Sequence, residues 1–503
     1  METQTTVNGA TKRTLSSVAH GGLHLDNINP YVKAAKYAVR GELAVKAEEY
    51  RVRLAQGDKS LPFESVIFAN IGNPQQLDQK PITFFRQVLS LLENPLLLEN
   101  PEALKSSFGY KQDVIDRANF LLEEVQSVGA YSHSQGAPAI RDSVAKFIEQ
   151  RDGFPANPQD MYLCGGASSG VNTLLSVICN GPSTGVLVPI PQYPLYTATL
   201  SLLNAQCVPY HLEEDKAWGT PVDAIRQSLL KAKAEGTEVR AIVVINPGNP
   251  TGASLSPDDI KNVLDLAAEE KLVVMADEVY QTNVFVGEFT SFKKRLRQLQ
   301  KESPGKYDDV ELASLHSVSK GMVGECGHRG GYFELVGFDP QVAAQIYKFV
   351  SIMLCPPVIG QCLLEMMVNP PKQGEPSFEL YNKEYTGIRD GLHKRALALY
   401  EAFQKMEGVQ CQQPQVHLTP SPISTPSNKN RAQCISSQPL PSHQRPSKPL
   451  QPKAVPLTNS TASVSSTRQV SVSSPALASA RKKIPCISAR LSLLLARIGL
   501  SGL

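Results

Sequence analysis

The feature that most constrains the fold is an alternation of short apolar runs with amphipathic segments. Apolar runs begin at Met161, Gly185, Arg240, Lys271 and Glu311, and each leads into a turn that carries glycine, proline or a polar side chain. Several of the intervening segments carry apolar residues at helical spacing. Strands that alternate with helices form right-handed βαβ units. The sequence therefore predicts an α/β fold with a mainly parallel, doubly wound sheet.

The residues whose side chains could bind a ligand or take part in a reaction follow the ends of these predicted strands. They are the Gly-Ala-Ser-Ser-Gly turn at 166–170, Tyr193, Asn249, Asp277 and Lys320. Ligands in open α/β sheets bind beyond the carboxyl ends of the strands. One shared ligand site at this edge of the sheet is the prediction.

The loop around Lys320 suggests what the ligand is. Ser317 and Ser319 precede the lysine, and Arg329 follows it by nine residues. A lysine amine attacks carbonyl groups only when it is unprotonated, so a catalytic lysine needs an unusual environment. Hydroxyls and an arginine beside the amine suggest a bound phosphate, and the combination suggests pyridoxal phosphate held as a Schiff base. Taken alone, the stretch also fits a surface lysine in a Ser/Gly loop.

The turn at 166–170 offers a second anion site. Apolar residues at helical spacing follow it, so the backbone amides of Ala167 and Ser168 are expected to open a helix. Free N–H groups and the helix dipole favour an anion there. A plain tight loop is the alternative for this turn alone.

Taken together, these motifs resemble the fold-type I pyridoxal-phosphate-dependent aminotransferases, and within them the alanine aminotransferase branch. The resemblance covers about residues 25–415. Its markers are Ala-Ser-Ser-Gly at 167–170, Pro-Gln-Tyr-Pro-Leu-Tyr at 191–196, Asn-Pro-Gly-Asn-Pro-Thr-Gly at 246–252, Ala-Asp-Glu-Val-Tyr at 276–280, and Ser-Val-Ser-Lys at 317–320 with Arg329. The extra residue between Lys320 and Arg329, within Gly-Glu-Cys-Gly, points to the alanine branch.

The resemblance implies a role for each site residue. Lys320 is similar to the Schiff-base lysine that also shuttles the proton. Asp277 is similar to the carboxylate that faces the pyridine nitrogen. Asn249 and Tyr280 resemble the donors to the ring hydroxyl, and Tyr193 resembles the stacking aromatic.

Further roles concern the phosphate, the partner and the substrate. Tyr131 resembles the tyrosine that reaches the phosphate of a neighbouring subunit, so a homodimer is implied. Gly72 matches the turn whose amide meets the substrate carboxylate. The implied phosphate cradle consists of Ala167, Ser168, Ser317 and Arg329.

The implied reaction moves an amino group between L-alanine and 2-oxoglutarate by ping-pong exchange, with pyruvate and L-glutamate as products. The cofactor is pyridoxal 5′-phosphate, and the partners are small amino acids and 2-oxo acids. Two alternatives stay open. One is a catalytically impaired relative, and the other is a lyase similar to the aminocyclopropane-carboxylate synthases.

The ends of the chain differ from its body. We expect a disordered N-terminus at 1–24, a large domain with an N-terminal arm at 25–380, and a connector helix into a truncated small domain at 381–415. Within the arm, apolar residues at helical spacing predict one helix over 29–54. Residues 416–503 are rich in Ser and Pro, which predicts disorder.

This tail also lacks an expected group. Eleven of the 50 Lys and Arg residues and none of the 47 Asp and Glu residues lie after residue 415, so the tail carries +11 and the rest −8. The family's small domain supplies an arginine that binds the substrate carboxylate, and no arginine stands in a matching context here. No aromatic residues are interleaved with the tail's charges, so we expect no nucleic-acid or membrane partner.

The cysteines indicate the compartment. There are nine, scattered and without a CxxC pair, which is typical of reduced thiols rather than a disulfide framework or a metal site. No apolar signal-peptide core follows Met1. We expect a cytoplasmic protein, with the mitochondrial matrix as the alternative.

Overall fold

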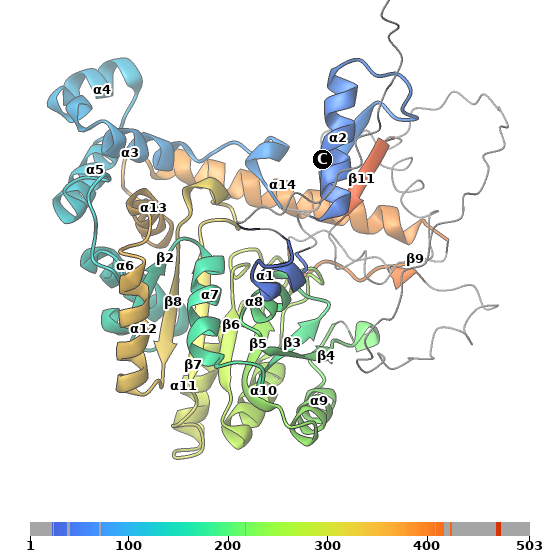
Figure 1. Ribbon diagram of the computed structural model, residues 1–503. Coiled ribbons are helices and arrows are strands. Elements are labelled where there is room, and N and C mark those ends of the chain that lie inside the picture. The colour runs from blue at the N-terminus through green and yellow to red at the C-terminus, as the bar shows by residue number, and fades with distance from the viewer. Residues whose placement is uncertain are drawn as a thin grey trace, which may run out of the picture.

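The computed structural model describes residues 23, 25–37, 41–69, 72–216, 218–407, 409–416, 423–424 and 469–473. Its centre is a seven-stranded sheet with the order β2-β8-β7-β6-β5-β3-β4, which Figure 1 shows between layers of helices. Within this sheet β8 alone runs in the opposite direction to the other six strands, so the predicted mainly parallel sheet is confirmed. The strands are β2 (Met161–Cys164), β3 (Thr184–Ile190), β4 (Gln206–His211), β5 (Glu238–Ile245), β6 (Val273–Asp277), β7 (Leu312–Ser317) and β8 (Gly331–Val336).

Side chains of each strand alternate between two cores. On β5, Ala241 and Val243 pack into a core with three helices on one face, whereas Ile242 and Val244 pack into a core on the other. A third core, around α3, α5, α6 and α13, adjoins the sheet at β2 and β8. The helices of the first face are α7 (Ala167–Ile178), α8 (Leu195–Leu202) and α12 (Pro340–Ile352), and those of the second are α9 (Val222–Ala234), α10 (Pro257–Glu270) and α11 (Phe292–Glu302).

Local sequence explains where these helices begin. Ser256 accepts a hydrogen bond from the backbone N–H of Asp259, whose carboxylate accepts one from the N–H of Ser256 in return. This is the expected capping box, and Pro257 occupies the first helical position.

The remaining helices of this part of the chain are α3 (Thr83–Glu93), α4 (Pro101–Phe108), α5 (Gln112–Val125), α6 (Pro138–Asp152) and α13 (Val358–Val368).

The N-terminal arm differs from the prediction. The single helix expected over 29–54 is wrong, because two helices occupy this range: α1 (Pro30–Ala34) and α2 (Glu42–Ala55). The backbone is extended at Ala35 and again at Gly41. Gly41 precedes α2 and supplies no side-chain cap. The break lets α1 pack against α8 beside the sheet.

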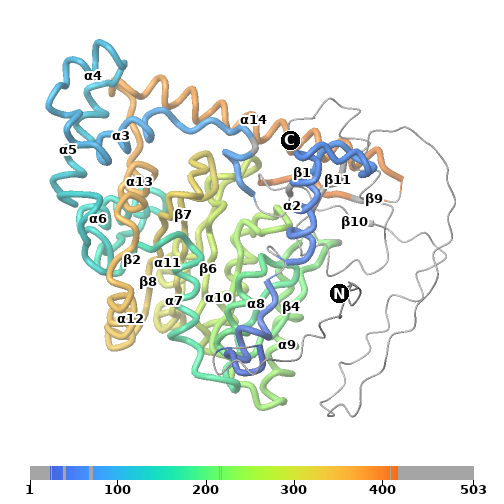
Figure 2. The backbone as a smooth tube through the Cα atoms, turned by 45° about the horizontal axis from the view of Figure 1, so that its top comes forward, coloured from blue at the N-terminus to red at the C-terminus, as the bar shows by residue number. Residues whose placement is uncertain are grey.

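The C-terminal part begins with α14 (Phe378–Gln404), a helix that overlaps the range 381–415 where a connector helix was expected. Its connecting role stays a prediction. Figure 2 shows this helix running along the body from α3 and α4 towards α2 and β9. Strand β9 (Val409–Gln410) pairs with β10 (Ile423–Ser424), and β11 (Gln469–Ser473) pairs in parallel with β1 (Ser65–Ala69). The Ser/Pro-rich pattern did not indicate β10 or β11.

Other expectations for the ends of the chain lie mostly outside the described residues. This holds for the disorder expected at 1–24 and for most of that expected at 416–503. Within the described ranges, no helix has both the length and the apolar character needed to cross a bilayer. The same residues contain no group of three or more His, Cys, Asp or Glu side chains arranged to hold a metal ion.

Candidate active site

Lys320 lies in the turn that follows β7, where its amine meets a backbone carbonyl. The Nζ atom donates a hydrogen bond to the carbonyl oxygen of Gly72 over 2.6 Å. Burial lowers the pKa of the Lys320 amine, and nearby Arg329 lowers it further, while Cys326 raises it. A Cβ on Gly72 would lie 3.0 Å from the amine. The absence of a side chain at Gly72 therefore leaves room for a reactive, readily deprotonated amine.

Asp277 is the last residue of β6 and its carboxylate is buried. The hydroxyl of Tyr196 donates to one carboxylate oxygen over 2.6 Å, and the N–H of Val279 donates to the other over 3.3 Å. Burial raises the pKa of Asp277, and these two donors oppose that rise. A cation beside a buried carboxylate stabilises its charged form, so this position suits a protonated ring nitrogen.

Asn249 and Tyr280 are neighbours at the ends of β5 and β6. The Nδ2 atom of Asn249 donates to the hydroxyl of Tyr280 over 3.4 Å. Burial raises the pKa of Tyr280, with smaller contributions from Asp277 and Tyr193. The phenol is therefore neutral and able to donate a hydrogen bond, as the predicted role requires.

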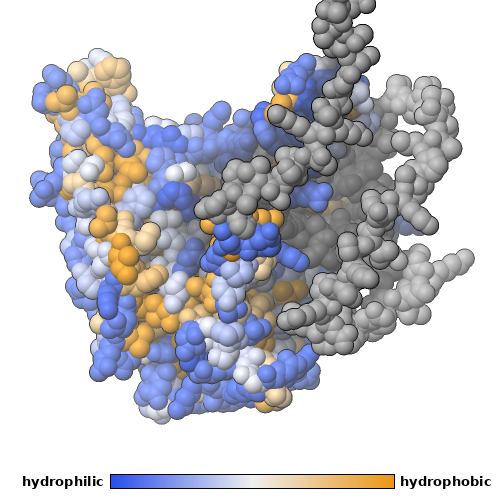
Figure 3. Space-filling view, viewed as in Figure 1, coloured by the Kyte–Doolittle hydropathy of each residue, from blue (hydrophilic) through white to orange (hydrophobic). Residues whose placement is uncertain are grey.

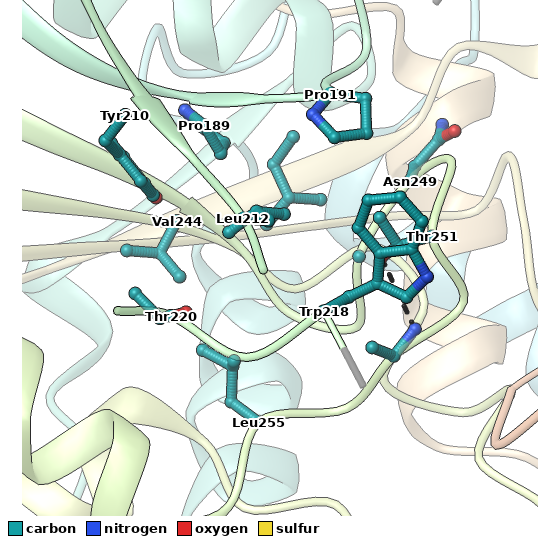
Figure 4. Close-up of a pocket in the computed structure, with 13 residues that line it drawn as sticks. Pro189, Pro191, Tyr210, Leu212, Trp218, Thr220, Val244, Asn249, Thr251 and Leu255 are labelled. Carbon is teal, nitrogen blue, oxygen red and sulfur yellow. Dashed lines mark hydrogen bonds between the residues drawn. The ribbon is translucent and has the colours of Figure 1, made fainter. Parts of the chain in front are cut away.

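A small cavity of about 20 Å³ borders Asn249. Figure 4 shows Trp218 and Thr251 beside Asn249 at this cavity, and residues of β3, β4 and β5 and of the loops near their ends form its other walls. The volume suffices for a water molecule. The lining residues are Pro189, Pro191, Tyr210, Leu212, Trp218, Thr220, Val244, Ile245, Gly248, Asn249, Thr251, Ala253 and Leu255.

Arg329 and the start of α7 form the candidate anion cradle. One guanidinium nitrogen of Arg329 donates to the carbonyl of Gly165 over 2.8 Å and to the hydroxyl of Ser168 over 3.2 Å. Gly166 has φ +86°, and a Cβ there would lie 2.5 Å from that nitrogen. Only glycine therefore permits this approach. The cradle thus combines a guanidinium with a helix N-terminus that begins at Ala167.

Ser317 was predicted to belong to the same cradle. Its side chain is buried at the end of β7, and its hydroxyl accepts a hydrogen bond from the N–H of Ser319 over 3.2 Å. This contact shapes the turn that leads to Lys320. A direct contact with phosphate stays a prediction.

Two tyrosines at the site were missed by the sequence reasoning. Tyr37, from the arm, shares a hydrogen bond with the hydroxyl of Tyr193 over 2.7 Å. Burial raises the pKa of Tyr193, and the bond to Tyr37 raises it further. Tyr196, the donor to Asp277, lies inside the motif at 191–196, which was a signal that could have identified it.

Tyr131 lies apart from the other predicted site residues of this chain. It is 78% exposed, in the loop that precedes α6. Two residues later, the ring of His133 stacks on Tyr347 of α12 at 5.6 Å. The structure thus brings together Gly72, Ala167, Ser168, Tyr193, Asn249, Asp277, Tyr280, Lys320 and Arg329, with Ser317 beneath the turn.

Comparison with known proteins agrees with this arrangement. The family model described as "Aminotransferase class I and II" matches residues 102–436. The mitochondrial alanine aminotransferase of Saccharomyces cerevisiae is 53% identical, over 78% of this chain and 67% of its own length. A second protein of that yeast, named an inactive alanine aminotransferase, is 47% identical over 78% of this chain and 79% of its own length.

A solved structure shares the fold. The alanine aminotransferase of Pyrococcus furiosus superimposes with a TM-score of 0.59 at 21% identity, covering 77% of this chain and 82% of its own. The site also fits the family's cofactor, since it offers a lysine amine with a lowered pKa, a buried carboxylate and an anion cradle. The chain belongs to the class I and II aminotransferases, whose cofactor is pyridoxal 5′-phosphate.

Proposed function

We propose that this protein transfers the amino group of L-alanine to 2-oxoglutarate, giving pyruvate and L-glutamate. The observation that carries the proposal is the amine of Lys320, whose pKa is lowered by burial and which lies at Gly72 in the same site as Asp277 and Arg329. The names of the yeast relative and of other relatives at 43–48% identity support the choice of alanine.

Pyridoxal 5′-phosphate, when bound, supplies a carbonyl carbon for the amino group and a ring that accepts electrons. The neutral Nζ of Lys320 accepts the proton of the substrate α-carbon and later returns it. Asp277 holds a proton at the ring nitrogen. Arg329, Ser168 and the first amides of α7 hold the phosphate.

The remaining site residues orient these groups. Tyr193, whose hydroxyl is held by Tyr37, would stack on the cofactor ring. Asn249 and Tyr280 would donate to the ring hydroxyl. Gly72 is the residue we assign to the substrate carboxylate. Each assignment rests on the position of the side chain together with the motif that contains it.

An impaired relative is the second candidate. It is motivated by the yeast protein named inactive, whereas the relatives named as alanine aminotransferases support the active enzyme. The sequence of the tail also has no arginine in a context that matches the family's substrate-binding arginine. A bidentate arginine contributes strongly to positioning a substrate carboxylate. In this candidate the cofactor binds but transfer from L-alanine is slow.

One experiment decides between these candidates. The absorbance of the purified protein with pyridoxal 5′-phosphate is recorded before and after addition of L-alanine, and pyruvate is assayed. A spectral change with pyruvate formation, lost in Lys320→Ala, supports the transaminase. A bound cofactor that does not respond to L-alanine identifies the impaired relative. The lyase alternative is tested by replacing L-alanine with an amino acid that carries a leaving group on its γ-carbon. Elimination products from that amino acid, with no pyruvate or glutamate formed from L-alanine and 2-oxoglutarate, would favour the lyase.

We also propose a homodimer. Tyr131 is largely exposed, and His133, two residues later, packs on α12. At the end of that helix, Ile352 and the next two residues, Met353 and Leu354, are 70%, 74% and 54% exposed. Figure 3 shows apolar residues on this side of the molecule. A patch of this kind favours association. Analytical ultracentrifugation tests the dimer, and Tyr131→Phe tests whether the hydroxyl contributes to cofactor affinity across it.

The cellular location has two candidates. The sequence favours the cytoplasm, whereas relatives from S. cerevisiae, Dictyostelium discoideum and Arabidopsis thaliana are named mitochondrial, which supports the matrix. Cell fractionation with antibodies to this protein separates the two.

A further inference from the structure

The loop between Lys320 and Arg329 is held from outside by a set of contacts that the transfer reaction does not use. Glu325, at its centre, is 2% exposed in its side chain. Arg86 of α3 donates to both of its carboxylate oxygens, over 2.9 and 3.0 Å. The ring of His328 lies 3.0 Å from the same carboxylate. A buried carboxylate with a two-pronged arginine partner has a closely defined position.

The same arginine reaches the segment that follows Gly72. Its second guanidinium prong also donates to the side-chain oxygen of Gln75 over 2.8 Å, and the Gln75 amide donates to the carbonyl of Gly324 over 3.2 Å. The Gln79 amide donates to the carbonyl of Met322 over 3.2 Å. Three contacts thus hold the segment at 75–79 against the loop. Gln75 and Gln79 each bond a carbonyl of the loop, and Arg86 bridges Gln75 and Glu325.

Both ends of the loop carry groups of the active site. The amine of Lys320 bonds the carbonyl of Gly72, three residues before Gln75. A guanidinium nitrogen of Arg329 donates to the carbonyl of Cys326, the residue after Glu325, over 3.0 Å. Displacement of Glu325 therefore moves the acceptor that orients Arg329, and it loosens the segment that carries the acceptor of Lys320.

Glycine at position 324 is required for this closure. Gly324 has φ +59°, and a Cβ there would lie 2.6 Å from the Gln79 side-chain nitrogen. A side chain at 324 would displace the Gln79 amide that bonds the loop at Met322, and it would strain the backbone at this positive φ. The Gly-Glu pair within the longer loop thus supplies both the close approach and the buried carboxylate.

We propose that Arg86, Glu325 and Gln75 form a positioning clamp, which fixes the lysine amine relative to the arginine of the phosphate cradle. The clamp rests on the proposed function, since it acts on the residues that hold pyridoxal 5′-phosphate. Its members are positioning residues and touch no substrate. Gly72 lies against the amine of Lys320, so a clamp that holds the segment after Gly72 in place also preserves the burial that lowers the pKa of Lys320.

The test is a double-mutant cycle of Glu325→Gln, Arg86→Met and both together in the full chain. Two quantities are measured: the dissociation constant for pyridoxal 5′-phosphate and the pH dependence of the rate at which cofactor-free protein captures it. Each single change is expected to weaken binding about tenfold, as for a lost hydrogen bond to a charged group. The double change is expected to weaken it little more than either. The apparent pKa of capture should rise, because water reaches the amine.

The matched control is Asp265→Asn on α10, a carboxylate that binds Lys261, Lys306 and Tyr307 away from the site. It should lower the melting temperature and leave affinity and the capture profile unchanged. If the clamp variants behave like this control, the proposal is wrong. Arg86→Lys keeps the positive charge but cannot donate to both carboxylate oxygens at once. It should shift the cofactor affinity and the pH profile of capture in the same direction as Arg86→Met, but by less. Failure of the unaltered protein to bind the cofactor would instead overturn the proposed function.

Discussion

The active site has two halves that are held in place by different means. Asp277 ends β6 and is paired with β5 and β7, and Ser317, three residues before Lys320, ends β7 and is paired with β8. Gly72 and Tyr37 come from the first 80 residues and are held at the site by side-chain contacts, from Lys320 to the Gly72 carbonyl, from Gln75 and Gln79 to the lysine loop, and between the Tyr37 and Tyr193 hydroxyls. A ladder of backbone hydrogen bonds resists displacement better than side-chain contacts do. Changes in the strand half should therefore affect the rate of the reaction most strongly. Changes in the N-terminal half should mainly affect how well the site is ordered.

The largest expected effect is that of Lys320→Ala in the strand half. Loss of the amine removes the group that moves the α-proton, and such a loss costs about 10²- to 10⁴-fold in rate. The measurement is pyruvate formation from L-alanine at saturating cofactor. A variant that keeps more than a tenth of the activity would show that another group moves the proton.

Asp277→Asn should be the next most damaging. The neutral amide cannot stabilise a protonated ring nitrogen, and loss of such an electrostatic contact costs about 10²- to 10³-fold. Tyr196→Phe is the control, since it removes one donor to Asp277 and keeps the charge. It should cost about tenfold or less. Comparable losses in both variants, measured as kcat/KM, would contradict a role for the charge itself.

The sequence predicts the strand half much better than the N-terminal half. Strands and their terminal residues form local patterns, so Asp277 and Lys320 were identifiable from a few neighbours. Tyr37 meets Tyr193 across 156 residues and Arg86 meets Glu325 across 239, and no local pattern encodes such pairings. The break between α1 and α2 was missed for the same kind of reason, since it depends on the packing of α1 against α8.

Behind the strand half, Glu278 makes stability depend on pH. Arg151 donates hydrogen bonds to Asp152 and Gln281 and approaches Glu278 only to 3.8 Å. Burial raises the pKa of Glu278 to about 8, and Arg151 offsets only part of that rise. The folded protein thus holds a proton that the unfolded chain releases at lower pH. The stability that the protonated Glu278 contributes is therefore complete in acid, and it is lost as the pH rises through about 8.

Glu278→Gln tests this linkage. The amide cannot ionise, so the variant should lose less stability than the unaltered protein between about pH 5 and about pH 8, by on the order of a few kcal/mol. Chemical denaturation across that range measures it. Glu269→Gln, at the surface of α10 with Arg226, is the control and should leave the pH dependence unchanged. An identical pH dependence in Glu278→Gln would mean that Glu278 is ionised throughout.

The smallest effect is expected in the N-terminal half, from Tyr37→Phe. This change removes one hydrogen bond to Tyr193, so cofactor affinity should fall by a factor of about 2 to 12, which corresponds to the usual range of about 0.5 to 1.5 kcal/mol. Binding is reciprocal, so the cofactor should in turn protect the arm from trypsin at Lys33 and Lys36 in the unaltered protein and less so in the variant. Tyr31→Phe is the matched control, because that hydroxyl has no hydrogen-bond partner among the described residues. Equal protection in both variants would show that the arm docks independently of the site. A loss as large as that of Asp277→Asn would place Tyr37 among the residues on which the chemistry depends, and the contrast between the two halves would fail.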